Sequence, residues 1–222
     1  MRQIKANEKN LYEEYIYIVE MPKLKDAHHN TYYMVGKRFI DLFISILLLP
    51  KVLVVILLFS ILIKIESPGP VLFLQERVGR NGEYFKVIKL RSMFMNEEAN
   101  ETVWTKKDDP RITRIGKFIR KTRIDELPQI FNVLKGEMSI IGPRPEQPLL
   151  TAKFEQKYPG FIKRLIVKPG ITGWAQVNGG YELSPDEKMN LDFYYIQNKS
   201  TLLDMKIMLK TMKVVVTGDG AR

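Results

Sequence analysis

The chain has 222 residues, contains no cysteine and carries a formal net charge of +10 at pH 7. The absence of cysteine excludes disulfide bonds, thiolate catalysis and thiolate metal sites. The excess of positive charge favours an anionic partner, which is a nucleic acid, an acidic membrane surface or a phosphorylated substrate. The length suits one ordinary domain with attachments.

One apolar run, from residue 39 to residue 63, stands out along the chain. It is longer than the about 20 residues that a helix needs to span a bilayer. Pro50, near its middle, removes a helical hydrogen bond and should bend the helix. Lys51 follows at once, and a lysine at the bilayer centre costs about 2.5–3.5 kcal/mol. Both features argue against a simple span.

The flanks of this run are basic on both sides, because Lys37 and Arg38 precede it and Lys64 follows it. Such residues beside a membrane segment favour the cytoplasmic face, so the pattern keeps both ends there. We therefore favour a re-entrant helix, which enters the bilayer, breaks at Pro50 and returns, over a helix that spans it. A helix buried in a soluble core is the third interpretation, and it fits less well because the run is apolar on all sides.

The rest of the chain predicts short elements joined by turns. In chain order, the patterns indicate a short helix at 11–19, a hairpin of strands at 71–75 and 84–91, a polar loop at 97–109, a basic amphipathic helix at 112–122, a helix with apolar positions from 127 to 134, helices at 149–158 and 185–197, and a last amphipathic helix that reaches residue 216. One globular unit joined to one membrane element fits this order.

Two adjacent carboxylates, Asp125 and Glu126, most strongly indicate chemistry. They precede Pro128 and apolar positions with helical spacing, and proline is favoured in the first turn of a helix. The acids are therefore expected at a helix N-terminus, among free amide donors and the positive end of the helix dipole. Downstream, two prolines restrict the backbone around Arg144. A reactive carboxylate with a fixed guanidinium suits chemistry at phosphorus, although an aspartate here can also serve only as a helix cap.

A series of motifs covers about residues 36 to 216. The motifs are Lys37-Arg-Phe-Ile-Asp41, Ser67-Pro-Gly-Pro70, Gln75-Glu-Arg-Val-Gly79, Lys89-Leu-Arg-Ser-Met93, Asp109-Pro-Arg-Ile-Thr113, Arg123-Ile-Asp-Glu-Leu-Pro-Gln129, Asn132-Val-Leu-Lys-Gly-Glu-Met-Ser139, Gly142-Pro-Arg-Pro-Glu146, Lys168-Pro-Gly-Ile-Thr-Gly-Trp-Ala-Gln-Val177 and Asp192-Phe-Tyr-Tyr195. In this order they resemble the small monotopic phosphoglycosyl transferases, the bacterial sugar transferases that act on polyprenyl phosphate. Leu49 departs from the family pattern, in which a serine often precedes the proline of the membrane helix.

The resemblance implies a helix-rich α+β fold. Residues 1–35 would form a polar N-terminal extension, residues 36–65 the re-entrant membrane helix, and residues 66–222 a cytosolic catalytic domain with amphipathic interfacial helices. Such a monotopic protein would lie on the cytoplasmic face of the bacterial inner membrane, against anionic lipid. The larger members' additional spanning helices are not expected here, and the sequence leaves a homo-oligomer open.

The resemblance also implies a reaction, the transfer of a sugar 1-phosphate from a UDP-sugar to undecaprenyl phosphate with release of UMP. This would be the first membrane step of exopolysaccharide, capsule or glycoconjugate synthesis. The partners expected are these two substrates and the membrane, and no nucleic acid is expected. Neither the sugar nor the glycan pathway follows from the sequence.

By the same resemblance, Asp125 is the nucleophile and forms an aspartyl–phosphosugar intermediate. Mg²⁺ would be held by Asp125 and by phosphate oxygens of the donor. Glu126 would either support the metal or move a proton, and Arg144 would bind phosphate through its guanidinium. Three further residues are assigned to phosphate binding and to the organisation of the site: Lys89, Arg120 and Asp192.

Two other functions are compatible with parts of the sequence. A membrane-anchored basic module that binds nucleic acid or anionic lipid without catalysis explains the charge and the anchor, but not the paired acids or the arginine between prolines. A glycosyl transferase that moves the sugar alone would release UDP instead of UMP. The nucleotide product therefore distinguishes the two enzymes.

Overall fold

The computed structural model describes residues 31–95 and 109–217, so the helix predicted at 11–19 and nearly all of the loop predicted at 97–109 lie outside the described part. The α-helices are α2 (Thr31–Glu66), α3 (Arg114–Lys121), α4 (Ile130–Lys135), α5 (Pro148–Lys157), α6 (Trp174–Val177), α7 (Pro185–Asn198) and α8 (Thr201–Thr217). The strands are β1 (Leu72–Val78), β2 (Tyr84–Leu90), β3 (Ser139–Ile141) and β4 (Gly170–Thr172). The 3₁₀ helices are η1 (Arg80–Gly82), η3 (Ile124–Gln129), η4 (Phe161–Ile166) and η5 (Gly180–Glu182). This helix-rich set with two small sheets is compatible with the predicted α+β class.

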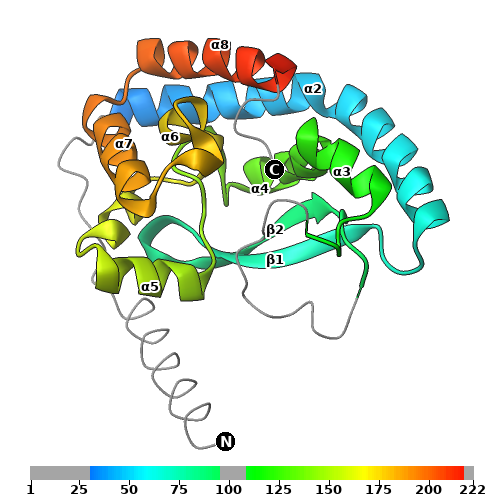
Figure 1. Ribbon diagram of the computed structural model, residues 1–222. Coiled ribbons are helices and arrows are strands. Elements are labelled where there is room, and N and C mark those ends of the chain that lie inside the picture. The colour runs from blue at the N-terminus through cyan, green and yellow to red at the C-terminus, as the bar shows by residue number, and fades with distance from the viewer. Residues whose placement is uncertain (1–30, 96–108, 218–222) are drawn as a thin grey trace, which may run out of the picture.

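The long helix α2 lies across the globular body and bends down along one side of it (Figure 1). Pro50 lies inside this single helix, so α2 is bent but continuous, and the break predicted at Pro50 is not found in it. The helix begins at Thr31, earlier than the start predicted at residue 36. Val52 and Ile63 are buried against the body, whereas most of the other apolar side chains of α2 are exposed. The apolar run therefore covers the body without being enclosed by it.

Strands β1 and β2 form the antiparallel hairpin that the sequence predicts. The turn between them contains Asn81, whose positive φ of 56° is a backbone conformation that asparagine tolerates better than most residues. After β2, the buried Arg91 donates hydrogen bonds to the carbonyl groups of Ser67 and Pro68, at 2.7 Å each. Arg91 thereby fixes the loop that leads from α2 into the hairpin.

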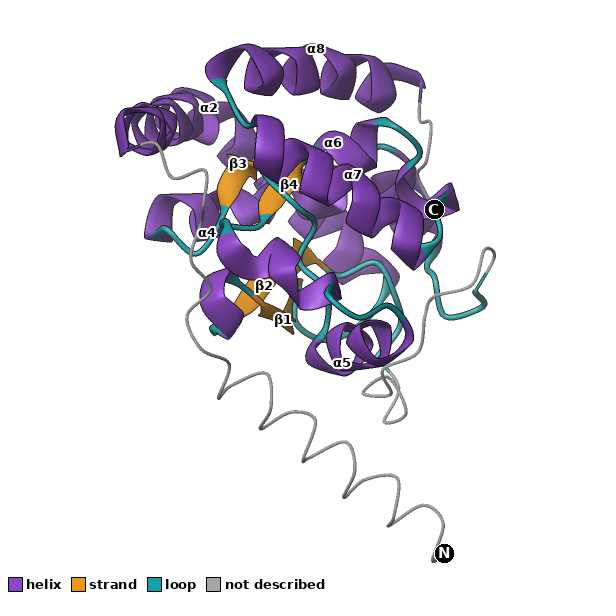
Figure 2. Cartoon of the chain, turned by 90° about the vertical axis from the view of Figure 1, so that its left-hand side faces the viewer, coloured by secondary structure: helices purple, strands orange, loops and turns teal. Residues whose placement is uncertain are grey.

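Strands β3 and β4 pair in parallel, a pairing that the patterns in the sequence do not predict. Glycines let the two backbones approach closely. A Cβ on Gly142 would lie 2.4 Å from the Lys168 carbonyl oxygen, and a Cβ on Gly170 would lie 2.1 Å from the Gly142 amide nitrogen. No larger residue fits at these two positions. Figure 2 shows this sheet below α8 and beside α7, apart from the β1–β2 hairpin.

The two C-terminal helices cover the parallel sheet. Tyr195 of α7 and Ile207 of α8 are buried in one cluster with Ile141 of β3. The Ser200 hydroxyl accepts a hydrogen bond from the Leu203 amide (3.3 Å), as a residue at a helix start does. The structure confirms the helices predicted at 112–122, at 149–158, at 185–197 and up to residue 216, with ends that differ by one or two residues.

Candidate active site

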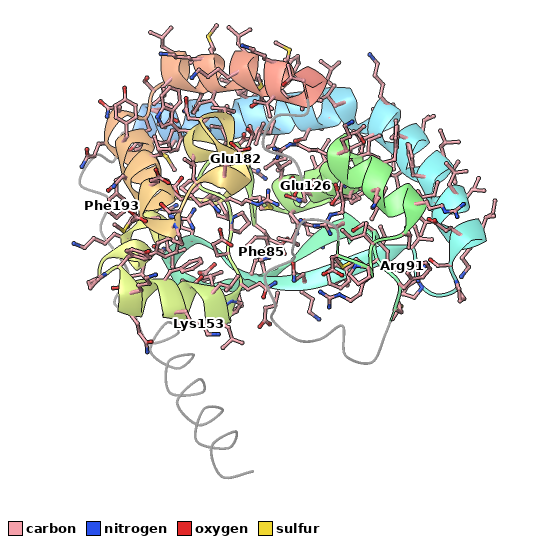
Figure 3. All side chains as sticks on the ribbon, viewed as in Figure 1. Phe85, Arg91, Glu126, Lys153, Glu182 and Phe193 are labelled. Atoms are coloured by element: carbon pink, nitrogen blue, oxygen red, sulfur yellow. The ribbon has the colours of Figure 1, made fainter. Side chains whose placement is uncertain are left out.

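The two acids lie at the start of a helix, as predicted. Asp125 and Glu126 occupy the first turn of η3, and Pro128 lies inside it. The α-helix itself starts only at Ile130, so it is shorter than the pattern from residue 127 predicts. The two side chains are buried, with 9% of Asp125 and 8% of Glu126 exposed. In Figure 3 Glu126 lies near the centre of the view, beside α4 and above the hairpin.

Asn132 of α4 holds this region on strand β2. Its side-chain oxygen accepts a hydrogen bond from the Ile88 amide (3.1 Å), and its side-chain nitrogen donates to the Lys86 carbonyl (2.8 Å). The amide group thus pairs with backbone groups at the edge of β2 that faces away from β1. Because the helix is fixed at Ile88, the next residue of the strand, Lys89, comes within reach of Glu126.

Glu126 is enclosed by two cations. Its Oε1 accepts hydrogen bonds from the Lys89 ammonium group (3.1 Å) and from Nη2 of Arg144, and its Oε2 accepts one from Nη1 of Arg144 at 3.3 Å. Burial raises the pKa of Glu126, but Arg144 and Lys89 outweigh burial and hold that pKa well below its usual range. Glu126 is therefore ionised at neutral pH, and cationic donors engage both of its oxygens.

Asp125 has the opposite shift. Burial and the neighbouring charge of Glu126 raise the pKa of Asp125 to about 6, although Lys89, Arg120 and Arg144 act to lower it. Above this pH the carboxylate is ionised but poorly solvated, which makes its oxygen reactive toward an electrophile. Adjacent carboxylates with pKa values moved apart are typical of a site in which each has a different role.

The turn that carries Arg144 is held by four consecutive carbonyl groups, which accept hydrogen bonds from residues of three other elements. The bonds run from the Gly170 amide to Pro143 (2.9 Å), from the Arg164 guanidinium to Arg144 (3.0 Å), from the Arg77 guanidinium to Pro145 (3.1 Å) and from the Val78 amide to Glu146 (3.0 Å). The donors belong to β4, η4 and β1. The turn therefore presents the Arg144 side chain to Glu126 from a rigid support.

The structure places Asp192 behind the other predicted residues. The side chains of Arg164 and Asp192 form an ion pair and are 4% and 1% exposed. Since Arg164 also donates to the carbonyl of Arg144, Arg164 links Asp192 to the site. Arg120 of α3 does act on the centre of the site, because its charge lowers the pKa of Asp125. Asp125, Glu126, Lys89, Arg120 and Arg144 are thus brought together.

The described residues include no group of three His, Cys, Asp or Glu that would hold a metal by itself. Mg²⁺ is usually bound in proteins by one or two carboxylates, with water and substrate phosphates completing its shell. Asp125 offers such a carboxylate, whereas Lys89 and Arg144 engage the oxygens of Glu126. This donor set fits a magnesium ion that arrives with a diphosphate.

Among the residues that the structure describes, α2 is the one helix long and apolar enough to cross a membrane. Within the segment Tyr33–Glu66, a window of 18 residues has a mean hydropathy of 3.0, and 11% of that window is buried. Large apolar side chains are exposed on α2 at Phe39, Leu47, Val54, Leu57 and Ile61, and on α8 at Leu202, Met205, Leu209 and Met212. Exposed apolar surface of this extent indicates contact with a membrane or a partner.

Three residues that fix the site were not assigned a role from the sequence: Asn132, Arg77 and Arg164. Arg164 carries a usable signal, because an arginine within the apolar stretch Phe161–Ile166 needs a partner if that stretch is buried. Asn132 is a comparable polar residue among the apolar positions of α4. The role of Arg77 depends on a contact with a distant turn, which no local pattern contains.

The fold and the site define a membrane-associated protein with a buried carboxylate of raised pKa beside cations suited to phosphate. The chain belongs to the bacterial sugar transferase family, whose model matches residues 32–218.

Relatives carry names that specify an acceptor. A UDP-N-acetylgalactosamine-undecaprenyl-phosphate N-acetylgalactosaminephosphotransferase of Aeromonas hydrophila is 49% identical over 189 residues, which are 84% of this chain and 45% of that protein. Two proteins named UDP-glucose:undecaprenyl-phosphate glucose-1-phosphate transferase are similar as well. The one from Klebsiella pneumoniae is 41% identical over 87% of this chain and 43% of its own length, and the one from Caulobacter vibrioides is 38% identical over 83% and 71%. The chain thus spans less than half of the first two.

Proposed function

We propose that this protein transfers a sugar 1-phosphate from a UDP-sugar to undecaprenyl phosphate and releases UMP. The observation that carries the proposal is the buried Asp125 carboxylate, whose pKa is raised to about 6 beside Lys89, Arg120 and Arg144. The names of the relatives supply the acceptor and the transferred group. The product would begin exopolysaccharide, capsule or glycoconjugate synthesis.

In the first step, an ionised oxygen of Asp125 attacks the sugar-linked phosphorus of the donor. A new oxygen–phosphorus bond forms, the bond from that phosphorus to the bridging oxygen breaks, and UMP leaves with the bonding electrons. In the second step, a phosphate oxygen of undecaprenyl phosphate attacks the same phosphorus, and the Asp125 carboxylate leaves. With ionised phosphates, neither step needs a net proton.

The other side chains of the site position and neutralise charge in this scheme. Glu126 keeps Lys89 and Arg144 side by side, and its low pKa makes it unsuited to carry a proton at neutral pH. A phosphate resembles a carboxylate as an acceptor for a guanidinium, so Arg144 binds a substrate phosphate with the same nitrogens that meet Glu126. Arg120 adds a further positive charge beside Asp125.

Asp125 and the diphosphate oxygens of the donor would hold Mg²⁺, for which this donor set is suited. When bound, the ion neutralises the diphosphate and stabilises UMP as a leaving group.

The contacts of α2 support the re-entrant arrangement, and the basic residues at both ends of the apolar run favour the cytoplasmic face of the inner membrane. Near the start of the helix, Arg38 donates to the carbonyl groups of Val133 and Leu134, at 2.6 and 3.0 Å. At its end, Glu66 accepts hydrogen bonds from the first amides of α3. A spanning helix separates its ends by the bilayer, about 30 Å of hydrocarbon. Because both ends of α2 contact the same body, we place them on one side.

The reaction is tested by the nucleotide product. Purified protein in lipid nanodiscs, with Mg²⁺ and undecaprenyl phosphate, is given a panel of UDP-sugars that starts with UDP-N-acetylgalactosamine and UDP-glucose. We expect UMP, and mass spectrometry of the protein mixed with donor alone should find the phosphosugar on Asp125. Release of UDP, or no turnover with any donor in the presence of a verified acceptor, would overturn the proposal.

The topology is tested with single cysteines, which the natural chain lacks. Asn10→Cys and Gly220→Cys are expressed separately, and intact cells are exposed to a thiol reagent that does not cross the membrane. Both cysteines should be shielded until the cells are permeabilised. Labelling of one cysteine alone in intact cells would show that α2 spans the membrane.

A further inference from the structure

The amide of Ile140 lies at the open edge of the parallel sheet. Ser139 and Ile141 of β3 pair with β4, and the amides of Ser139 and Gly142 donate to carbonyl groups on that side, each at 2.9 Å. Neighbouring residues of a strand direct their amides to opposite sides, so the Ile140 amide, next to that of Ser139, points away from β4; Gly142, just after the strand ends, no longer follows this alternation. A buried amide left without a partner costs about 1–3 kcal/mol. The Ile140 amide therefore needs an acceptor that does not belong to a neighbouring strand.

The acceptor comes from the membrane helix. Oδ1 of Asp41, on α2, accepts a hydrogen bond from the Ile140 amide at 3.0 Å, and Asp41 is 5% exposed. The Ser139 hydroxyl interacts with the same carboxylate. A carboxylate within the apolar run of α2 therefore accepts a hydrogen bond from the backbone of β3, although α2 has ample apolar surface with which to pack.

From Ile140 the chain leads directly to Arg144. Four residues of extended chain cover about 13 Å. Along this path the Gly142 amide, the Pro143 carbonyl and the Arg144 carbonyl are all hydrogen-bonded. The segment therefore keeps Arg144 at a fixed position relative to Ile140, so a change in where α2 meets β3 changes the position of Arg144 relative to α2.

The two substrates differ in how they reach this site. A UDP-sugar is soluble and can approach at any height above the membrane. The phosphate of undecaprenyl phosphate is held at the membrane surface by its lipid chain, so the site must lie at a matching height. A misplacement of about 1 Å can slow a reaction by about a hundredfold. The position of the site relative to α2 therefore matters more for the lipid substrate.

We infer that Asp41 is a positioning residue that sets the height of Arg144, Glu126 and Asp125 relative to the lipid-embedded helix, and that it serves the transfer to the lipid acceptor rather than the attack on the soluble donor. The inference rests on the proposed function. It assigns to α2 a part in the reaction beyond anchoring.

The test separates the two steps in lipid nanodiscs. Release of UMP in a single turnover without acceptor reports the first step, and transfer to undecaprenyl phosphate reports the second. In Asp41→Leu we expect the first rate within about twofold of the unmodified protein and the second reduced at least about tenfold. Asp41→Asn keeps an acceptor oxygen at the same place and should recover most of the second rate. Ser45→Ala is the matched control, because Ser45 is buried on the same helix and its hydroxyl has no hydrogen-bond partner among the described residues.

A second acceptor distinguishes positioning from general damage. With a short, water-soluble prenyl phosphate, whose height is not fixed, the defect of Asp41→Leu should disappear. Equal loss with both acceptors, equal loss in both steps, or no loss in either step would overturn the inference. If Asp41→Leu does not fold, Asp41→Glu, which moves the oxygen by one methylene group, is judged by the same criteria. Absence of UMP release from the unmodified protein would instead contradict the proposed function.

Discussion

The two faces of α2 hold different kinds of side chain on one helix. The face toward the body buries Val52 and Ile63 and also contacts the body through polar groups: Lys37 pairs with Asp204 at 2.9 Å, and Arg38, Asp41 and Glu66 bond backbone atoms of α4, β3 and α3. The outer face exposes aliphatic and aromatic side chains. A hydrogen bond requires a defined distance and angle, whereas the benefit of burying apolar surface depends mainly on area. The inner face can therefore fix where the candidate active site lies. The outer face can determine how strongly the protein binds the membrane.

The substitution with the largest expected effect separates catalysis from membrane binding. Asp125→Asn removes the proposed nucleophile, and we expect turnover to fall about a thousandfold or more. The apolar outer face is unchanged, so the fraction of protein in sedimented membranes should stay as it was. Measured UMP release near that of the unmodified protein would contradict the role of Asp125, and loss of membrane binding would contradict the separation of the two faces.

The next effect concerns the rigid turn. Arg144→Lys keeps the charge but loses the paired guanidinium nitrogens, so kcat/KM for the donor should fall about 10- to 100-fold. Lys153→Arg, on the exposed side of α5, is the control and should leave kcat/KM unchanged. An Arg144→Lys enzyme as active as its control would show that the geometry of the guanidinium is not used.

The pH dependence of the reaction rate tests the electrostatic environment of Asp125 on the inner side of the molecule. Because burial and Glu126 raise the pKa of Asp125 to about 6, the protonated, unreactive form accumulates below that pH. The rate of UMP release in a single turnover should therefore fall about tenfold per pH unit below 6 and level off above 7. Lys89 acts to lower this pKa, so Lys89→Met should move the midpoint to higher pH. A rate that is constant from pH 5 to pH 8 would contradict this account.

A smaller effect tests the outer face. Leu57→Glu on α2 and Leu209→Glu on α8 each replace an exposed leucine by a charge. Each leucine would be buried in the bilayer when the protein is bound, so its loss should weaken membrane binding about tenfold, measured by flotation with vesicles of anionic lipid. Single-turnover UMP release in detergent should change less than about twofold, since neither residue contacts the site. A loss of that activity without a change in flotation would contradict the assignment of these leucines to membrane binding.

The smallest effect tests the far end of α2. Glu66 accepts hydrogen bonds from the amides of Arg114 (2.7 Å) and Ile115 (3.0 Å), where a negative charge also meets the positive end of α3. Glu66→Gln keeps an acceptor and loses the charge, which should reduce the free energy of unfolding by about 0.5–1 kcal/mol. The melting temperature in detergent should fall by about 1–4 °C. An unchanged value would mean that this contact does not secure the end of the helix.

Local patterns in the sequence were sufficient for much of this architecture. The apolar run with Pro50, the hairpin with Asn81 at its turn and the acids before Pro128 each depend on residues a few positions apart, and such patterns act through backbone geometry and periodicity. The parallel pairing of β3 with β4 was missed because the strands are three residues long and lie far apart in sequence. Short apolar stretches do not reveal their partners.

The sequence by itself determined that a long apolar helix adjoins a basic domain, and that Asp125 and Glu126 stand together at a helix start. Only the tertiary structure decided how these two differ, since Lys89 and Arg144 arrive from β2 and from the turn after β3 to engage Glu126. It also decided that Asp192 acts through Arg164 and that Asp41 reaches the Ile140 amide. The physical reason is that a buried charge or amide is stabilised by whichever partner the whole fold brings within about 3 Å, and that partner is set by packing rather than by neighbours along the chain.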